Sequence, residues 1–333
     1  MGKIPFSILF AVIACMMSSC SGSKQWQKDE GAVWATTYHI TYLSEKELSD
    51  SIQDVMRQVE LSLSPFNPQS TISRINDNRT DSTDALIDSV MAISLRVNRI
   101  SGGMYDPTVS PLINIWGFGY TGHPSDDRLP SPTQTMIDSA LNLVGIAECS
   151  IADGRMIKKS PGTTFNFSSV TKGLGCDMVG AMLKRNGVTD YMVEIGGEMA
   201  LSGRNPRGKK WRIQIADPAS DRDGQQAMRV IELTDCGIAT SGNYRNYLTD
   251  KSGTRHGHTI SPLTGQPIQT DIVSATVIAP TCAEADALGT ACMASTLPQA
   301  EAMLRSLPSV LAILAISLSS STDSLQIISI NMP

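Results

Sequence analysis

The stretch from His258 to Met293 constrains the fold most, because it predicts a complete structural unit: a turn, a strand and a helix. Residues 261–265, Ser-Pro-Leu-Thr-Gly, combine proline and glycine, the two residues that most favour a turn. Residues 272–279 are mostly apolar and β-branched and end at Pro280, which predicts a buried strand.

The helix that follows this strand carries a candidate metal site. Thr281 and Glu284 have the spacing of a capping box, so we expect the helix to begin there. Asp286 and Thr290 are one turn apart and would present two oxygen atoms on one face. A hard cation such as Mg²⁺ accepts these ligands. The alternative is a solvated Asp286 and a Thr290 hydroxyl bonded to its own backbone.

Composition limits the class of protein. The chain has 333 residues, 41% of them hydrophobic, enough for one large domain or two small ones. Its formal charge of −5, with no basic patch interleaved with aromatics, speaks against nucleic-acid binding. Beyond Cys20 the cysteines form no CxxC pair, which argues against a zinc site. Helices and strands mix without a βαβα order, so we expect an α+β fold.

The N-terminus predicts export. Residues 1–19 combine Lys3 with a short apolar run and fit a signal peptide. Small residues precede Cys20, as in the lipobox of bacterial lipoproteins, so we expect lipidation at Cys20 and a polar tether over residues 20–31. Cys15 is a rival site, and a plain secretory signal is the other alternative. The expected location is the periplasmic side of a bacterial membrane.

Two central segments are consistent either with a ligand pocket or with a purely structural role. Residues 104–119 mix aromatics, glycines and prolines with no clear period, which fits either a packed core loop or a pocket for a flat ring. Residues 166–175 predict a helix start beside Lys172. Free N–H groups after Ser169 would bind phosphate there, although a structural turn has the same pattern.

Six motifs together resemble the ApbE family, the FAD:protein FMN transferases. They are MYDPTVSPLINIWGFG, NFSSVTKGLGCD, EIGGE, ATSGNYRNY, HTISPLTGQPI and EADALGTACM, in the family's order. The resemblance implies one T-fold-like domain over residues 32–333, with mixed or antiparallel sheets, packed helices and possibly two subdomains around a central FAD cleft.

The resemblance also implies site residues. Mg²⁺ would be held at Ser169, Asp286, Gly289 and Thr290, and His258 would be the base. The positions implied to contact FAD are Trp34, Phe66, Met104, Tyr105, Asp106, Asn166, Lys172 and Ile260. Three positions depart from the family's pattern: Asn166 and Ser261 stand where Asp is usual, and residues 34–36 read Trp-Ala-Thr where Met-Gly-Thr is usual. Asn166 would still accept a hydrogen bond from FAD through its carbonyl.

The implied reaction is Mg²⁺-dependent transfer of FMN from FAD to a Thr or Ser hydroxyl of a partner protein, with release of AMP. The implied partners are respiratory membrane flavoproteins, such as sodium-pumping and electron-bifurcating complexes. Two alternatives remain open: a Mg²⁺-dependent FAD pyrophosphatase that uses water, and a lipoprotein that binds FAD without cleaving it.

Overall fold

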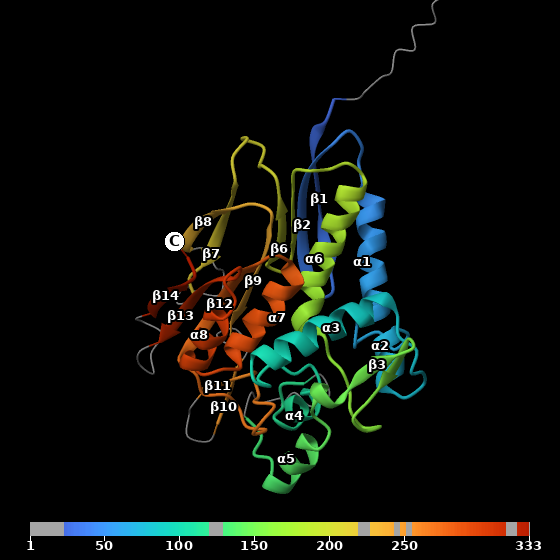
Figure 1. Cartoon of the computed structure of the whole chain (residues 1–333), viewed down its shortest axis with the longest axis vertical. Coiled ribbons are helices and arrows are strands. Elements are labelled where there is room, and N and C mark those ends of the chain that lie inside the picture. Colours follow the sequence, from blue (N-terminus) through green and yellow to red (C-terminus); the bar gives the residue numbers. More distant parts are fainter. Residues whose placement is uncertain are drawn as a thin grey trace, which may run out of the picture.

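One large antiparallel sheet organises the molecule (Figure 1). The computed structural model describes residues 23–119, 129–218, 227–242, 247–250, 255–317 and 325–332. The eight strands of the main sheet lie in the order β1-β2-β5-β6-β9-β12-β13-β14, and each paired neighbour is antiparallel. Their bounds are Gln25–Val33, Thr36–Ser44, Tyr191–Ile195, Glu198–Ser202, Cys236–Gly242, Ile272–Ala279, Leu311–Ser317 and Leu325–Ile330.

Three two-stranded ribbons lie outside the main sheet. They are β3–β4 (Ser150–Ala152, Arg155–Ile157), β7–β8 (Trp211–Ala216, Ala227–Leu233) and β10–β11 (Tyr247–Thr249, Arg255–Gly257). The helices are α1 (Ser49–Leu63), α2 (Thr71–Asn76), α3 (Ala85–Ile100), α4 (Ser110–Ile115), α5 (Gln134–Leu141), α6 (Ser168–Arg185), α7 (Cys282–Met293) and α8 (Leu297–Arg305). The expected α+β class is therefore confirmed.

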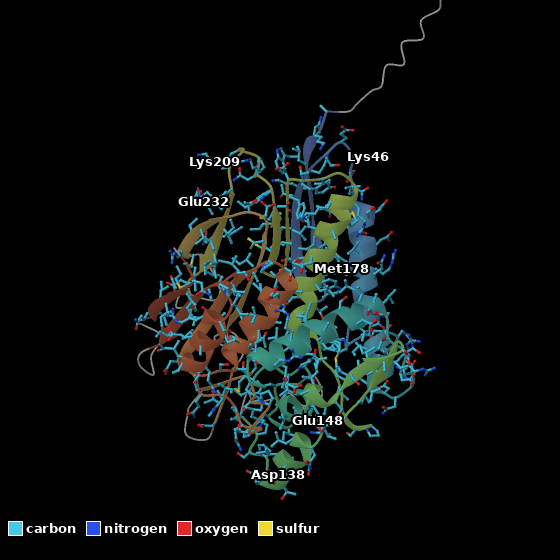
Figure 2. All side chains as sticks on the ribbon, in the orientation of Figure 1. Lys46, Asp138, Glu148, Met178, Lys209 and Glu232 are labelled. Carbon is cyan, nitrogen blue, oxygen red and sulfur yellow. The ribbon has the colours of Figure 1, made fainter. Side chains whose placement is uncertain are left out.

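Helices α6 and α7 pack side by side on one face of the main sheet, with α1 beside α6 and α3 across α7 (Figure 1). Two hydrophobic cores form between these helices and the sheet. Met178 of α6, labelled in Figure 2, packs against both cores. Within the described segments, no helix has the length and apolarity needed to cross a membrane.

The second face of the sheet is covered by the β7–β8 ribbon. Ile213 and Ile231 of this ribbon pack with Ile278 of β12 in a third core, whereas Val277 of the same strand faces the helices. Strand β12 is therefore buried on both faces, which explains why residues 272–279 are mostly apolar and do not alternate with exposed polar residues.

The N-terminal prediction is partly wrong. Residues 25–31 belong to β1 and pair with β2, so they are not a tether. Residues 33–43 are not one strand: they comprise the end of β1, a two-residue turn and most of β2. Trp34 and Ala35 form that turn with φ of 49° and 60°, the left-handed conformation that such hairpin turns require. The predicted signal peptide, residues 1–19, and Cys20 lie outside the described residues.

Candidate functional site

The contact between α6 and α7 brings the predicted site residues together. A Cβ atom on Gly173 of α6 would lie 2.4 Å from the carbonyl oxygen of Cys282, the first residue of α7. Only glycine permits this approach, because a side chain there would collide with backbone. The same glycine donates its N–H to Oδ2 of Asp286, at 3.1 Å. The crossing therefore fixes the Asp286 carboxylate next to the N-terminal half of α6.

Helix α7 is capped differently from the prediction. Thr281 accepts the N–H of Glu284, as expected of an N-cap. Glu284 itself does not complete the capping box; its carboxylate forms an ion pair with Arg96 of α3, at 2.7 Å. The remaining N-terminal N–H groups of α7, those of Cys282 and Ala283, donate to the two oxygens of Asp177 on α6.

A buried ion pair lies beside Asp286. The ammonium of Lys172 on α6 is 2.5 Å from Oε1 of Glu198, the first residue of β6. Glu198 is only 4% exposed, and its second oxygen, Oε2, is buried with no hydrogen-bond partner among the described residues. A buried polar atom without a partner costs free energy, so it points to a ligand that supplies one.

The pKa values of Lys172, Glu198 and Asp286 are all shifted from their ordinary values. The pKa of Glu198 is raised to about 7, first by burial and then by the charge of Asp286, against the opposing effect of Lys172. Burial also raises the pKa of Asp286, against the charge of Lys172 and the Gly173 N–H. For Lys172, burial lowers the pKa, but the Asp286 and Glu198 carboxylates outweigh it and raise the pKa above its usual value. Such clusters are typical of functional sites.

A cavity of about 350 Å³ opens onto these groups. Most residues predicted from the sequence line it: Met104, Tyr105, Asp106, Asn166, Ser169, Lys172, His258, Ile260, Asp286 and Thr290. Glu198, Thr240 and Ser241 line it as well. Asp286 is 3% exposed, so the alternative of a solvated carboxylate is wrong.

The donors around Asp286 suit Mg²⁺. Asp106, Glu198 and Asp286 bring three carboxyl groups to the cavity against the single ammonium of Lys172. The described segments contain no cluster of three or more His, Cys, Asp or Glu side chains arranged to hold a metal. A cation here would keep several positions for water or phosphate oxygens, as Mg²⁺ usually does. The buried Oε2 of Glu198 and the hydroxyl of Thr290 fit such a site.

Asn166 presents a donor rather than the expected acceptor. Its Oδ1 accepts the N–H of Ser168, at 3.0 Å, and the Ser168 hydroxyl, at 2.6 Å. A backbone N–H can only donate, so the carbonyl must face Ser168 and the NH₂ group is the end left for a ligand. The contact of Asn166 with FAD stays a prediction.

The expected phosphate site after Ser169 is also wrong in part. Helix α6 begins at Ser168, and the N–H groups of Val170 and Thr171 both donate to the carbonyl of Phe167, at 2.9 Å. They are not available to an anion. Lys172 remains as the cation of this segment, and the hydroxyl of Ser169 donates to Tyr105 at 3.0 Å.

Two residues predicted to contact the flavin, Asp106 and Tyr105, form hydrogen bonds within the protein. Asp106 accepts from the hydroxyl and N–H of Thr108 and from the N–H of Ile146, which ties the 104–110 segment to the loop after α5. Burial raises the pKa of the Tyr105 hydroxyl to about 12, against its hydrogen bonds with Ser169 and Ser94. Both residues thus shape the cavity wall from within.

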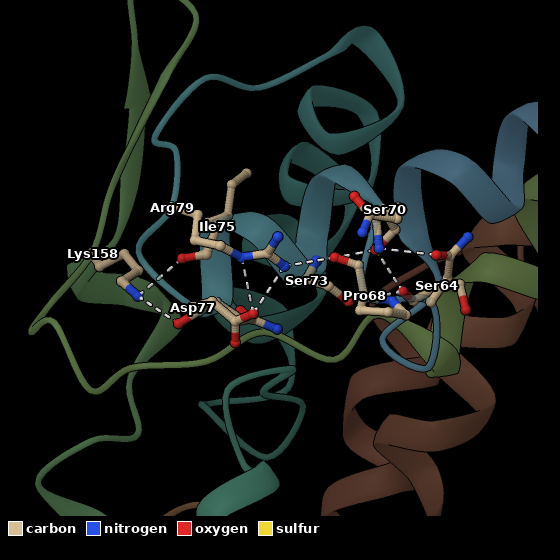
Figure 3. A network of polar contacts seen from close by, with 11 residues as sticks. Ser64, Pro68, Ser70, Ser73, Ile75, Asp77, Arg79 and Lys158 are labelled. Carbon is tan, nitrogen blue, oxygen red and sulfur yellow. Dashed lines mark hydrogen bonds and ion pairs between the residues drawn. The ribbon is translucent and has the colours of Figure 1, made fainter.

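Trp34 and Phe66 lie at a second cavity of about 680 Å³, which shares Ser168 and Lys172 with the first. Phe66 is 69% exposed. Its loop is held by hydrogen bonds to the carbonyls of Ser64 and Pro68, from Ser70, Ser73 and Arg79 (Figure 3). The indole N–H of Trp34 is buried without a partner among the described residues. The two cavities adjoin, as a long dinucleotide requires.

The turn at 261–265 is confirmed, and it explains one departure from the family's pattern. The hydroxyl of Ser261 accepts the N–H groups of Leu263 and Thr264, and Gly265 has φ of 68°. The indole of Trp116 donates to the carbonyl of Gly265, at 2.7 Å. Ser261 is not among the cavity residues, so its hydroxyl serves the turn, as an Asp side chain would.

Gly289 is the one predicted metal position outside the cavity wall. A Cβ atom there would lie 2.9 Å from the hydroxyl oxygen of Ser241 on β9, so this side of α7 faces the sheet. Its role at a metal stays a prediction.

Glu198 is the residue that the sequence did not predict. It ends the EIGGE motif, but nothing in its neighbourhood along the chain links it to Lys172, 26 residues earlier. Only the position of β6 under α6 brings the two charges together. The signal that could have found it is an acidic residue placed directly after two glycines in an otherwise apolar strand.

Comparison with known proteins shows the family of the chain. The sequence profile described as the ApbE family matches residues 34–314. The FAD:protein FMN transferase of Vibrio cholerae is 33% identical over 287 residues, covering 84% of each chain. That of Haemophilus influenzae is 33% identical over 306 residues, covering 87% of this chain and 86% of its own.

Solved structures agree with the fold as well. The flavin transferase ApbE from Vibrio cholerae superposes with a TM-score of 0.80 at 29% identity, over 92% of this chain and 97% of that one. The apo flavinyl transferase ApbE from Pseudomonas stutzeri has a TM-score of 0.80 at 28% identity, over 92% and 95% of the two chains. By sequence, fold and the residues gathered at its cavity, the chain belongs to the ApbE family.

Proposed function

We propose that this chain is an FAD:protein FMN transferase that moves FMN from FAD to a Ser or Thr hydroxyl of a partner protein, leaving a phosphoester and releasing AMP. Its relatives carry this name. The observation that carries the proposal is the buried Lys172–Glu198 pair beside Asp286, in a cavity that adjoins a second, partly aromatic one.

The two cavities suit the two parts of the substrate. The larger one offers Trp34, Phe66 and Pro65, flat and apolar surfaces on which a ring system can pack. The smaller one offers Lys172, the natural partner of a pyrophosphate. Since Lys172 lines both cavities, FAD that spans them places its phosphates near this ammonium.

Transfer requires an oxygen nucleophile to attack the FMN-side phosphorus while its bond to AMP breaks. The attacking hydroxyl must lose a proton, and His258 on the cavity wall is the candidate base, since a neutral imidazole nitrogen can accept that proton. Asp286 and Thr290 would hold Mg²⁺, with Glu198 within the same charged group. When bound, Mg²⁺ supplies charge neutralisation at the phosphate oxygens. Lys172 would stabilise the remaining negative charge on the phosphate oxygens.

We also propose that the chain is exported and lipid-anchored at Cys20, on the periplasmic side of a bacterial membrane. The residues before Cys20 support this. The acceptor would then be a flavoprotein subunit of a respiratory membrane complex.

The test is incubation of the purified chain with FAD, Mg²⁺ and a protein that carries a flavinylation motif. Fluorescent flavin that stays on the acceptor through a denaturing gel, with one AMP released per FMN bound, is the expected result. Free FMN and AMP without labelling would instead indicate a pyrophosphatase. Bound FAD that is never cleaved would indicate a flavin-binding lipoprotein.

Substitutions at two residues, Asp286 and His258, test the assigned roles. Asp286→Ala should abolish turnover, and Asp286→Asn, which keeps the shape, should require far more Mg²⁺; full activity in both would remove the metal assignment. His258→Ala should retain FAD binding but lose transfer, and normal transfer would reject His258 as the base. Asp88→Asn, on the exposed face of α3, is the matched control.

A further inference from the structure

One end of the molecule carries a concentration of basic side chains. It is the end where β1 begins, and four connections meet there: the start of β1, the β2–α1 loop, the C-terminus of α6 and the β6–β7 loop. Figure 2 labels Lys46 and Lys209 at this end, and Asp138 and Glu148 at the opposite one. We call it the basic end and define it by Lys24, Lys46, Lys184, Arg185, Arg204, Arg207, Lys209 and Lys210.

Hydrogen bonds join these connections into one surface. The ammonium of Lys24 donates to the carbonyl of Gly187, after α6, at 3.4 Å. The carbonyl of Asp190 accepts the N–H of Leu43 on β2, at 3.0 Å, and its side chain accepts the N–H of Arg204, at 2.7 Å. A hollow of about 370 Å³ there is lined by both Lys24 and Lys46. The four connections therefore adjoin one another in space.

The basic end is positive although the whole chain is acidic. All eight basic residues are exposed, and none forms an ion pair with another described residue. Asp190 and Asp235 at this end accept the backbone N–H groups of Arg204 and Gly203, which leaves their negative charges in place. The other carboxylates there are Glu45, Glu47, Asp50 and Glu232, the last opposite Arg212 across β7 and β8, so basic side chains still outnumber acidic ones at this end.

The basic end is also the end nearest the proposed anchor. Cys20 precedes Lys24 by four residues, and four residues span at most about 14 Å. If Cys20 is lipidated, as proposed above, Lys24 must lie within that distance of the bilayer surface. An acyl anchor alone holds a protein weakly unless a second contact adds to it. Each Lys or Arg near an anionic surface contributes about 1 kcal/mol.

We propose that the basic end binds anionic phospholipid headgroups of the membrane that holds the anchor. The inference rests on the proposed lipidation of Cys20 for its setting, but the surface acts without it. The contact would orient the molecule, because α4 and β10–β11, which adjoin the first cavity, lie at the opposite end (Figure 1). The cavity then faces away from the bilayer, toward the space where a partner protein approaches.

The test uses the mature chain from residue 20 with Cys20→Ser, which carries no acyl group. We expect it to co-sediment with phosphatidylcholine vesicles that contain phosphatidylglycerol, and not with vesicles of phosphatidylcholine alone. High salt should release it, because screened charges lose their attraction. Binding to neither vesicle, or equal binding to both, would overturn the proposal.

Two charge-reversal variants test whether the membrane contact lies at the basic end. The variant Arg207→Glu, Lys209→Glu, Lys210→Glu should lose at least about 100-fold in vesicle affinity, given about 1 kcal/mol for each basic residue. The control Arg74→Glu, Arg99→Glu, Arg305→Glu changes the net charge equally at exposed sites outside the basic end and should bind nearly as well as the parent. Equal losses in both variants would show that net charge, and not this surface, governs binding. FMN transfer to a soluble acceptor should stay unchanged in the basic-end variant, which separates this proposal from the proposed enzymatic function.

Discussion

Replacing Gly173 with alanine adds one methyl group at the point where α6 and α7 touch. Its carbon would lie 2.4 Å from the carbonyl oxygen of Cys282 and 2.7 Å from the Cα of Ala283. Both obstacles are backbone, so neither can rotate away. The helices would have to separate by about 1 Å to reach ordinary van der Waals contact. Such a shift also stretches the hydrogen bond from Gly173 to Asp286.

Three contributions determine the expected loss of unfolding free energy in Gly173→Ala. Overpacking costs about 1–3 kcal/mol, and weakening a bond to a buried carboxylate costs about 1 kcal/mol or more. Alanine in place of glycine inside a helix returns about 1 kcal/mol. We therefore expect Gly173→Ala to lower the free energy of unfolding by about 1–3 kcal/mol. A displacement of about 1 Å at a catalytic group costs on the order of 10²-fold in rate.

Urea denaturation and the rate of FMN transfer at saturating FAD measure the two effects. The matched control is Gly180→Ala in the same helix, where the new methyl meets only the tip of the Tyr191 side chain. That variant should lose less stability and keep its activity. A Gly173→Ala chain as stable as its parent, with unchanged transfer, would refute the idea that this crossing sets the site.

Three further predictions concern the hairpin turn, the α7 cap and the buried ion pair. Ala35→Gly should stabilise the chain by up to about 1 kcal/mol because Ala35 has φ of 60°, whereas Ala32→Gly within β1 should destabilise it; losses at both positions in thermal unfolding would contradict this. Burial raises the pKa of Asp177 to about 6 from an ordinary 3.8, so the fold binds its proton more tightly than the unfolded chain does. The stabilising contribution of Asp177, measured against Asp177→Asn, should be full below about pH 4 and fall by up to about 3 kcal/mol as the pH rises through 6. A difference in unfolding free energy between the two chains that stays constant or grows with pH in urea titrations would reject the assignment. Glu198→Gln should slow FMN transfer about 10- to 100-fold and raise the Mg²⁺ requirement, while Glu30→Gln on β1 should change neither.

Much of the site could be predicted because its parts have local signals. The strand at 272–279, the N-cap at Thr281 and the Asp286–Thr290 spacing are each determined by neighbours within one or two turns. Their chemistry, an acid and a hydroxyl on one helical face, follows from helix geometry alone.

The features missed have no such signal. Strand β1 lies at the edge of the sheet with most of its residues exposed or half-buried, so it lacks the apolar alternation by which strands are recognised. The turn at Trp34 and Ala35 contains neither glycine nor asparagine. The partnership of Glu198 with Lys172, and that of Glu284 with Arg96, depends on which elements meet in space.

The length of strand β1 determines how far the larger cavity lies from the basic end. It begins beside the basic end and leads at its other end to Trp34, on the wall of the larger cavity. Nine residues in extended conformation cover about 27–30 Å. With the basic end on the headgroups, the ring-binding part of the cavity would stand roughly that far above the bilayer, by the same rise per residue. A hydroxyl within the headgroup layer would then be out of reach, so the acceptor must present its Ser or Thr on a part that projects well clear of the membrane.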